Sequence, residues 1–239
     1  LLAAFGLPER IYEAGHSAIA AVIGGPAART LLDHDATAAV DTALDWQAQP
    51  GNAVLTLGDV GYPAALLEIP DPPVVLYVKG DPALLARQSV AVVGARNATP
   101  QGEANAEAFS AALSQAGLTI VSGLALGIDG AAHRGGLAGP GSTVAVIGTG
   151  ADRIYPARNA ALARRIAEAG AIVSEFPLGT APLAHNFPRR NRLIAGLACG
   201  VLVVEAALKS GSLITARLAI DCGREVFAIP GSIHSPVAR

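Results

Sequence analysis

LTIVSGLALGIDGAAH, residues 118–133, is the stretch that reveals the fold class of this chain. Its first five residues form an apolar and β-branched run that stops at Gly123, and a helical stretch follows from about residue 128. A strand without apolar–polar alternation is buried on both faces, which is typical of a parallel sheet. Gly123 and Gly127 flank the connection and predict a tight turn between strand and helix. The stretch is therefore one strand–turn–helix unit of an α/β protein.

The same unit recurs on both sides of this stretch. Further apolar strands are expected at residues 74–78, 89–93, 143–147, 171–175, 200–205 and 226–229. Helical stretches are expected at about 101–116, 128–138, 158–169, 187–198 and 212–223. Alternating strands and helices predict a Rossmann-like, doubly wound α/β fold with a mainly parallel sheet. Ligands of such folds bind outside the carboxyl ends of the strands, so the strand-to-helix turns are the first place to look for a site.

Residues 1–48 differ in character and predict a small helical domain. Pro8, Gly15 and Gly24 separate short Ala-rich stretches, and this segment holds six acids and two bases, a net charge of −4. Residues 49–239 hold 13 acids and 15 bases, a net of +2. The Pro-Gly pair that begins at Pro50 is a natural boundary. We therefore expect two domains, 1–48 and 49–239.

Composition excludes several classes of protein. Half of the residues are apolar and 15% are charged, which suits a packed domain rather than a disordered chain. No apolar run reaches the roughly 18 residues of a membrane span. The two cysteines, Cys199 and Cys222, form no CxxC pair. They predict neither a zinc site nor a disulfide framework, and we expect small core residues in a reducing, cytoplasmic compartment. No metal set, cofactor motif or catalytic triad stands out.

Two strand-to-helix turns carry residues suited to phosphate. After the strand at 89–93, Gly94 permits a tight turn and Arg96 offers a forked guanidinium, which pairs well with phosphate; the alternative is an arginine packed along a helix end. The run is not GxGxxG, so a dinucleotide fingerprint is absent. After the strand at 118–122, the segment of Ser122, Gly123 and Gly127 can present backbone N–H groups to an anion. His133 fits a hydrogen-bonded core histidine better than a ligand.

A third candidate is the segment of residues 186–192, Asn-Phe-Pro-Arg-Arg-Asn-Arg. Arg189, Arg190 and Arg192 have no acid near them in sequence and form the densest positive run of the chain. Phe187 offers a face on which a base can stack, and Asn191 can hydrogen-bond a base edge or phosphate. Cations at a helix start oppose the macrodipole, which favours a functional role over a merely solvated helix end.

A fourth candidate follows the strand at 200–205. Lys209 adds charge, Ser210 caps a helix start, and Gly211 and Thr215 lie in the same segment, which resembles an anion-binding nest. The serine–lysine pair raises the possibility of a hydrolase, but no G-x-S-x-G elbow is present. The turn at residues 148–156 carries Arg153 and Tyr155 and is interpreted as a simple turn.

Seven motifs occur together in one order over residues 54 to 235, and the chain thereby resembles the DNA-processing protein A family, also called Smf. They are residues 94–96, 122–133, Tyr155-Pro156 with Asn159, Ser174-Glu175, 187–192, 210–215 and 223–231. The resemblance implies an extended Rossmann domain preceded by a sterile-alpha-motif-like helical domain. It also implies a homodimer that binds single-stranded DNA and helps load the RecA recombinase in natural transformation, without catalysis. Leu126 and Gln101 depart from the Arg and Tyr that many relatives have there.

Three hypotheses follow from these residues. The first is a single-stranded DNA binding module, with the arginines and Lys209 on phosphates, the glycines at close backbone approaches and Phe187 stacking a base. The second is a nucleotide-processing hydrolase of the phosphoribohydrolase kind, in which Glu175 or Glu205, each at a strand end, acts as base. The third is a structural adaptor that docks through its acidic N-terminal domain.

Overall fold

The computed structural model describes residues 1–206 and 210–229, so Lys209 lies outside the described residues. The chain divides into two compact units, Leu1–Trp46 and Gln47–Arg239, close to the expected boundary. Among the described helices, none has the length and apolar character required to cross a bilayer.

The first unit is helical. Its helices are α1 (Leu2–Phe5), α2 (Pro8–Glu13), α3 (Gly15–Ile23), α4 (Gly25–Asp33) and most of α5 (Thr37–Gln47). Ile11, Ile19 and Ala28 are buried together and form its small core. Gly24 ends α3 with a positive φ of 84°, which a residue with a side chain rarely adopts. The expected helical domain is therefore present.

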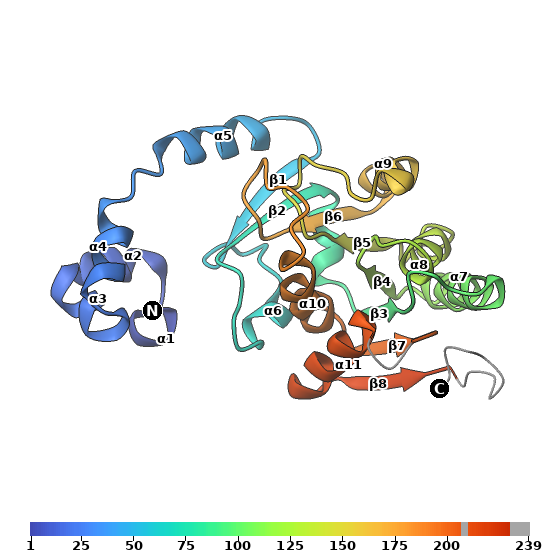
Figure 1. Cartoon of the computed structure of the whole chain (residues 1–239). Helices are drawn as coiled ribbons and strands as arrows, with labels where there is room; N and C mark the ends of the chain where they lie inside the picture. The colour runs from blue at the N-terminus through green and yellow to red at the C-terminus, as the bar shows by residue number, and fades with distance from the viewer. Residues whose placement is uncertain (207–209, 230–239) are drawn as a thin grey trace. The chain divides into compact units, whose positions relative to one another are not determined.

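The second unit is built on one eight-stranded sheet (Figure 1). The strands are β1 (Asn52–Thr56), β2 (Val75–Gly80), β3 (Ser89–Val93), β4 (Thr119–Ser122), β5 (Thr143–Val146), β6 (Ala171–Ser174), β7 (Gly200–Val203) and β8 (Glu225–Ala228). Their order in the sheet is β1-β2-β6-β5-β4-β3-β7-β8. The six strands from β6 to β8 pair in parallel, whereas β2 pairs antiparallel with both β1 and β6. The mainly parallel sheet predicted from the apolar strands is confirmed.

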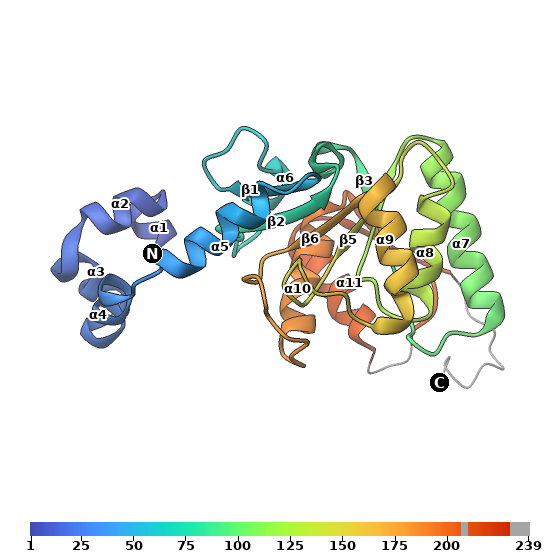
Figure 2. The ribbon, with the colours of Figure 1, turned by 90° about the horizontal axis from the view of Figure 1, so that it is seen from above.

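Helices cover both faces of this sheet, as Figures 1 and 2 show. On one face lie α7 (Pro100–Gln115), α8 (Ile128–Gly136) and α9 (Ala160–Ala169), side by side in Figure 2. On the other lie α6 (Ala64–Leu67), α10 (Asn186–Leu197) and α11 (Gly211–Asp221). Short 3-10 turns, η1 (Pro82–Ala86) and η2 (Ala157–Asn159), connect strands and helices. The largest core cluster packs Leu66, Leu193 and Ala219 against strand residues such as Val121 and Val201.

The strand order reverses direction beside β3. Strand β4 follows β3 in the chain and lies on one side of it, while β7 lies on its other side. Two neighbouring parallel strands whose connections leave in opposite directions open a crevice at their carboxyl ends, where α/β proteins bind ligands. The fold therefore places the turn after β3 and the turn after β7 at one crevice.

Candidate functional site

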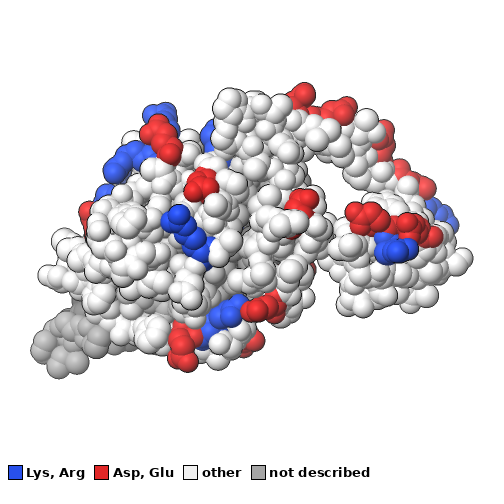
Figure 3. Space-filling model, turned by 180° about the vertical axis from the view of Figure 1, so that it is seen from behind, with Lys and Arg blue, Asp and Glu red and all other residues white. Residues whose placement is uncertain are grey.

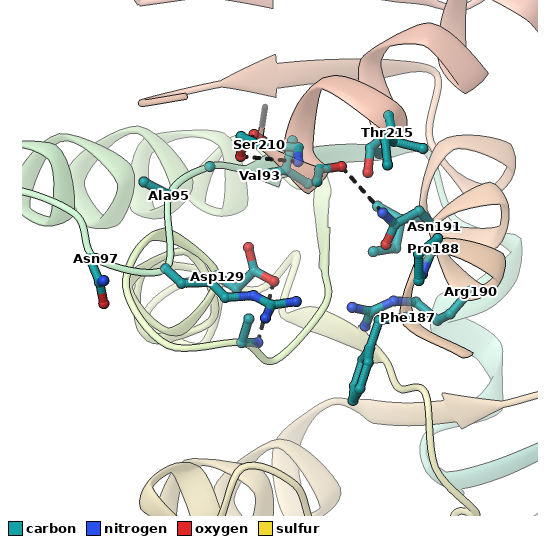
Figure 4. Close-up of a pocket in the computed structure, with 17 residues that line it drawn as sticks. Val93, Ala95, Asn97, Asp129, Phe187, Pro188, Arg190, Asn191, Ser210 and Thr215 are labelled. Carbon is teal, nitrogen blue, oxygen red and sulfur yellow. Dashed lines mark hydrogen bonds between the residues drawn. The ribbon is translucent and has the colours of Figure 1, made fainter. Parts of the chain in front are cut away.

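A cleft of about 560 Å³ occupies this crevice (Figure 4). Its walls come from four segments that are far apart in sequence: the turn after β3, the start of α8, the first half of α10 and the start of α11. The predicted site residues that line it are Gly94, Arg96, Phe187, Arg190, Asn191, Ser210, Gly211 and Thr215. The lining does not include Ser122, Gly123, Gly127, Arg189 or Arg192. The sequence interpretation thus located the cleft but mixed its lining residues with residues that hold them in place.

The turn after β3 packs closely against the start of α8 because glycines, which have no side chain, lie at the contact. The Ile128 N–H donates to the Ala95 carbonyl over 3.2 Å. Gly127 has a φ of +72°, and a Cβ there would collide with the carbonyl oxygens of Ala95 and Arg96. A Cβ on Gly94 would come within 2.6 Å of the Ile128 side chain. These glycines therefore shape the cleft by permitting close contact inside the protein.

The opposite wall of the cleft is the amino end of α11. The Ser210 hydroxyl caps this helix by accepting from the Ser212 N–H over 3.3 Å. Asn191 donates from its amide to the Gly211 carbonyl over 3.3 Å and so ties α10 to α11. A Cβ on Gly211 would meet open space. The positive end of this 11-residue helix therefore lines an accessible cavity that suits an anion.

Arg96 and Phe187 face each other across the mouth of the cleft. The guanidinium carbon of Arg96 lies 5.9 Å from the centre of the Phe187 ring, within cation–π range. Arg96 is exposed and Phe187 is half-buried. In Figure 4 the ring points away from Ser210 and Thr215, which lie on the far side of the cleft. The site thus offers a solvent-accessible cation next to an aromatic face.

Arg190 is not the exposed phosphate-binding cation that the sequence suggested. Only 5% of the residue is accessible, and its Nη1 donates to the carbonyls of Gly123, over 2.7 Å, and Val146. Gly123 directly follows β4 and Val146 is the last residue of β5, so the guanidinium ties α10 to the carboxyl ends of these two strands. Burial lowers its pKa to about 10, and Asp129 opposes that shift. Arg190 reaches the cleft wall, but its main partners belong to the protein.

The three arginines have no acid near them in sequence, but the free positive patch inferred from this is wrong, because Glu175, directly after β6, lies next to two of them. The Glu175 side chain is 4% exposed, and its two oxygens accept from Nη1 and Nη2 of Arg192 over 2.6 and 2.7 Å. Arg192 also contacts Asp71 through its Nε at 3.3 Å. Arg189 lies 3.6 Å from Glu175 and remains 59% exposed. The charge at the start of α10 is therefore balanced by a carboxylate distant in sequence, and Arg192 is an internal ion-pair partner.

Ser122 and His133 are also internal. The Ser122 hydroxyl donates to the Val92 carbonyl over 2.7 Å. His133 is fully buried, as expected for a core histidine: its Nδ1 lies 2.7 Å from the Thr143 hydroxyl, and its Nε2 accepts from the Leu124 N–H over 3.2 Å. Burial, reinforced by Arg190, lowers its pKa to about 3. Both residues hold the turn after β4 rather than face a ligand.

The expectation of two core cysteines is wrong for Cys199, which is exposed.

Sequence reasoning did not identify Asp129 as part of the site. It lines the cleft from the first turn of α8 while being 8% exposed, and it accepts from the Ala125 N–H over 3.3 Å. Burial raises its pKa, and Arg190 acts in the opposite direction. The sequence indicated that Asp129 lies at the helix start that follows β4, but it did not indicate that Asp129 approaches α10.

The two carboxylates considered as catalytic bases are both engaged by the protein. Glu175 binds Arg192, and Glu205 accepts from the Thr99 N–H over 2.9 Å at the start of α7. A Cβ on Gly102 would collide with the Glu205 carboxylate, so this side chain is closely packed. Neither glutamate is among the described residues that line the cleft. The two glutamates that the hydrolase hypothesis named as bases are therefore engaged outside the cleft, and Asp129 is the carboxylate in its lining.

Comparisons with known proteins agree with this architecture. The profile of the family described as DNA recombination-mediator protein A matches residues 53–239. Protein Smf of Escherichia coli (strain K12) is 49% identical over 198 residues, 82% of this chain and 53% of that protein. DNA processing protein DprA of Streptococcus pneumoniae is 48% identical over 189 residues, 79% of this chain and 66% of that protein. The chain thus spans between about half and two thirds of the length of these curated relatives.

Solved structures extend the match to three dimensions. The X-ray structure of DNA processing protein A from Streptococcus pneumoniae superposes with a TM-score of 0.81 at 40% identity, covering 99% of this chain and 87% of that one. DNA processing protein A from Helicobacter pylori, described for its single-stranded DNA binding mode, gives a TM-score of 0.70 at 35% identity, covering 76% and 83%. Sequence and fold together show that the chain belongs to the DNA recombination-mediator protein A family.

Proposed function

We propose that the cleft binds single-stranded DNA. The observation that carries the proposal is the meeting of three groups at the crevice: the positive end of α11, the exposed Arg96 and the ring of Phe187. A helix amino end and an arginine bind phosphate, and an aromatic ring stacks a base. Nucleic acid is a ligand that offers an anionic backbone and flat bases at regular spacing, so these groups match it together.

The form of the cleft favours a single strand over a duplex. A cavity of about 560 Å³ takes a small part of a strand at a time. Bases in a duplex are stacked on one another, so Phe187 can reach only an unpaired base. The relative from Helicobacter pylori, whose structure concerns single-stranded DNA binding, supports the same choice.

The test is a fluorescence-anisotropy titration with labelled single-stranded and duplex oligonucleotides at two salt concentrations. We expect tighter binding of the single strand, and we expect Arg96→Ala to weaken it by about 1.5–3 kcal/mol, as for a hydrogen bond to a charged group. Arg87→Ala is the matched control, because Arg87 is exposed just before β3, at the other end of the strand that leads to Arg96. Equal affinity for both forms of DNA, or equal effects of the two variants, contradicts the proposal.

Family membership supports further proposals about the whole protein. We propose that it acts on incoming DNA in the cytoplasm without catalysis, as a homodimer that helps load RecA recombinase in natural transformation. Light scattering of the purified chain tests the dimer, and filament assembly by RecA on DNA coated with it tests loading. Release of base or phosphate from nucleotides, lost in Glu175→Gln or Glu205→Gln, would instead favour the hydrolase hypothesis.

A further inference from the structure

Tyr155 belongs to the turn after β5, which the sequence interpretation treated as a simple connection. Tyr155 is 46% exposed, and the neighbouring Ile154 is 45% exposed. The Tyr155 ring lies against Phe187, with ring centres 5.6 Å apart and planes inclined by 38°. Since Phe187 lines the cleft, this contact places a second, more exposed aromatic ring directly beside it.

The turn that carries Tyr155 is held by its own hydrogen bonds. The Thr149 hydroxyl donates to the Arg153 carbonyl over 3.0 Å, and the Arg153 N–H donates to the Gly150 carbonyl over 2.9 Å. The Asp152 carboxylate accepts from the Gly179 N–H at 2.8 and 3.0 Å. The Gly150 N–H donates to the Thr180 carbonyl over 3.0 Å. The ring is therefore presented from a fixed loop, which lowers the entropic cost of binding a ligand on it.

We propose that Tyr155 is a second base-stacking platform, which carries the strand from the cleft onto the turn after β5. The proposal rests on the proposed binding of single-stranded DNA in the cleft. A base sandwiched between two rings needs a stacking contact of about 3.5 Å on each side. The separation of 5.6 Å between Tyr155 and Phe187 is too small for that. Each ring must therefore use its own open face, and two bases are bound rather than one.

The charge around Tyr155 agrees with a strand passing over it. Arg153 and Arg158 precede and follow it closely in sequence, and both are exposed. The acid of this turn, Asp152, accepts from the Gly179 N–H and keeps its negative charge, so residues 152–158 carry a net charge of +1. Arg153 also lines a small cavity of about 110 Å³, whose other charged lining residues are Arg164, Lys79 and Asp152. The excess of one positive charge in this turn favours the phosphates of a strand that passes over Tyr155.

A double-mutant cycle separates a platform from a residue that only orients Phe187. The affinity for a single strand of about 16 nucleotides, the upper range of site sizes for one binding domain, is measured for Tyr155→Ala, Phe187→Ala and the double variant. A stacked base corresponds to a loss of roughly fivefold to hundredfold. We expect each single variant to lose at least about fivefold, and the double variant to lose clearly more than either single variant, with a departure from the product of the two that measures the ring–ring contact. Tyr155→Phe keeps the ring and should bind like the parent.

Phe109→Ala is the matched control, since Phe109 is 48% exposed on α7, away from the cleft lining. A direct readout is Tyr155→Trp, whose added emission should be quenched by the strand. An unchanged affinity of Tyr155→Ala, a double variant no weaker than Phe187→Ala, or an unquenched Trp overturns the second platform. If Arg96→Ala and Phe187→Ala also bind like the parent, the proposed function itself has failed, so the two failures are distinguishable.

Discussion

Neighbouring arginines on α10 have different environments, and their spacing on the helix explains why. Arg189 is 59% exposed and lies over the Phe176 ring, with 5.9 Å between its guanidinium carbon and the ring centre. Arg190, one residue later, points about 100° further around the helix and is buried under the ends of β4 and β5. Adjacent positions on a helix never face the same surroundings, so a run of arginines in sequence is not a positive patch in space.

The pair Arg189→Ala and Arg190→Ala tests this difference. Removal of Arg190 leaves the Gly123 and Val146 carbonyls without their charged donor, which should cost about 1.5–3 kcal/mol of unfolding free energy. Removal of the exposed Arg189 should change the unfolding free energy by no more than about 0.5 kcal/mol. Chemical denaturation followed by circular dichroism measures both. Equal midpoints for the two variants would show that the buried contacts do not stabilise the fold.

His133 makes stability depend on pH. The Thr143 hydroxyl donates to the Ile120 carbonyl over 2.7 Å, so it accepts from His133 Nδ1, while Nε2 accepts from the Leu124 N–H. Only the neutral ring satisfies both contacts, in agreement with the pKa of about 3 against an ordinary value of 6.5. Between these two pH values the unfolded chain binds a proton that the folded chain does not, so stability falls as pH falls from about 6.5 towards 3.

The expected slope from this one group is up to about 1.4 kcal/mol per pH unit. His133→Gln removes the titration, so the difference in unfolding free energy between parent and variant should shrink as the pH falls from 7 to about 4. Urea titrations at several pH values measure it, with the exposed His16→Gln as control. If the difference in unfolding free energy between the parent and His133→Gln stays constant over this pH range, the folded chain does not hold His133 as a buried neutral ring.

At the scale of elements, the cleft depends on the close approach of the turn after β3 to the start of α8. Gly127→Ala should disrupt it for two reasons, the positive φ of 72° and the collision with the Ala95 and Arg96 carbonyls. Gly117→Ala isolates the first reason, because Gly117 has a φ of 90° and open space around it. We expect Gly117→Ala to cost roughly 1–2 kcal/mol of stability, and Gly127→Ala to cost more and to weaken DNA binding as well. Similar losses in both variants would show that the collision is relieved without cost.

The elements themselves were largely predictable, because continuous apolar strands and the glycines that end them are local signals. All seven expected strands are present, as are α7 to α11. The sequence interpretation missed β1 and α6. Strand β1 is a short edge strand that pairs antiparallel, and its apolar stretch of Ala53 to Leu55 directly follows the Pro-Gly pair that was interpreted as the domain boundary. Helix α6 has four residues, too few to show a helical period.

The site was predictable only in part, because its partners come from distant positions in the chain. The turns that carry Gly94, Arg96 and Gly211 were recognisable from residue type and place. The ion pair between Arg192 and Glu175 and the burial of Arg190 were not, since both depend on how α10 crosses the ends of β4, β5 and β6. Local sequence therefore identified the cleft, and tertiary packing decided which arginines remain free to meet a ligand.

For the whole molecule, charge is sparse and mixed rather than gathered by sign. On the face seen in Figure 3, basic and acidic side chains lie near one another and most of the surface is uncharged. With Arg190 and Arg192 engaged inside the protein, the exposed cations near the proposed path of the strand are few: Arg96 at the cleft, Arg189 on α10, and Arg153 and Arg158 at the turn of Tyr155. Each phosphate contact on a single strand contributes a log–log salt slope of about −0.7. We therefore expect the log–log salt slope of the parent chain to be small in magnitude. The magnitude of this slope should fall by about 0.7 in Arg96→Ala and stay unchanged in Phe187→Ala. Titrations over a range of salt concentrations measure all three slopes.

The two compact units make a final prediction possible, since the cleft and the platform at Tyr155 both lie within residues 47–239. Residues 1–46 hold six acids and two bases, a net charge of −4, which repels a phosphate backbone. A chain that begins at Gln47 should therefore fold, keep its preference for single strands, and bind DNA at least as tightly as the whole chain at low salt. This advantage should diminish as salt screens the charge. Circular dichroism verifies folding and anisotropy measures affinity. A folded chain that no longer binds DNA would place an essential part of the site in the first unit.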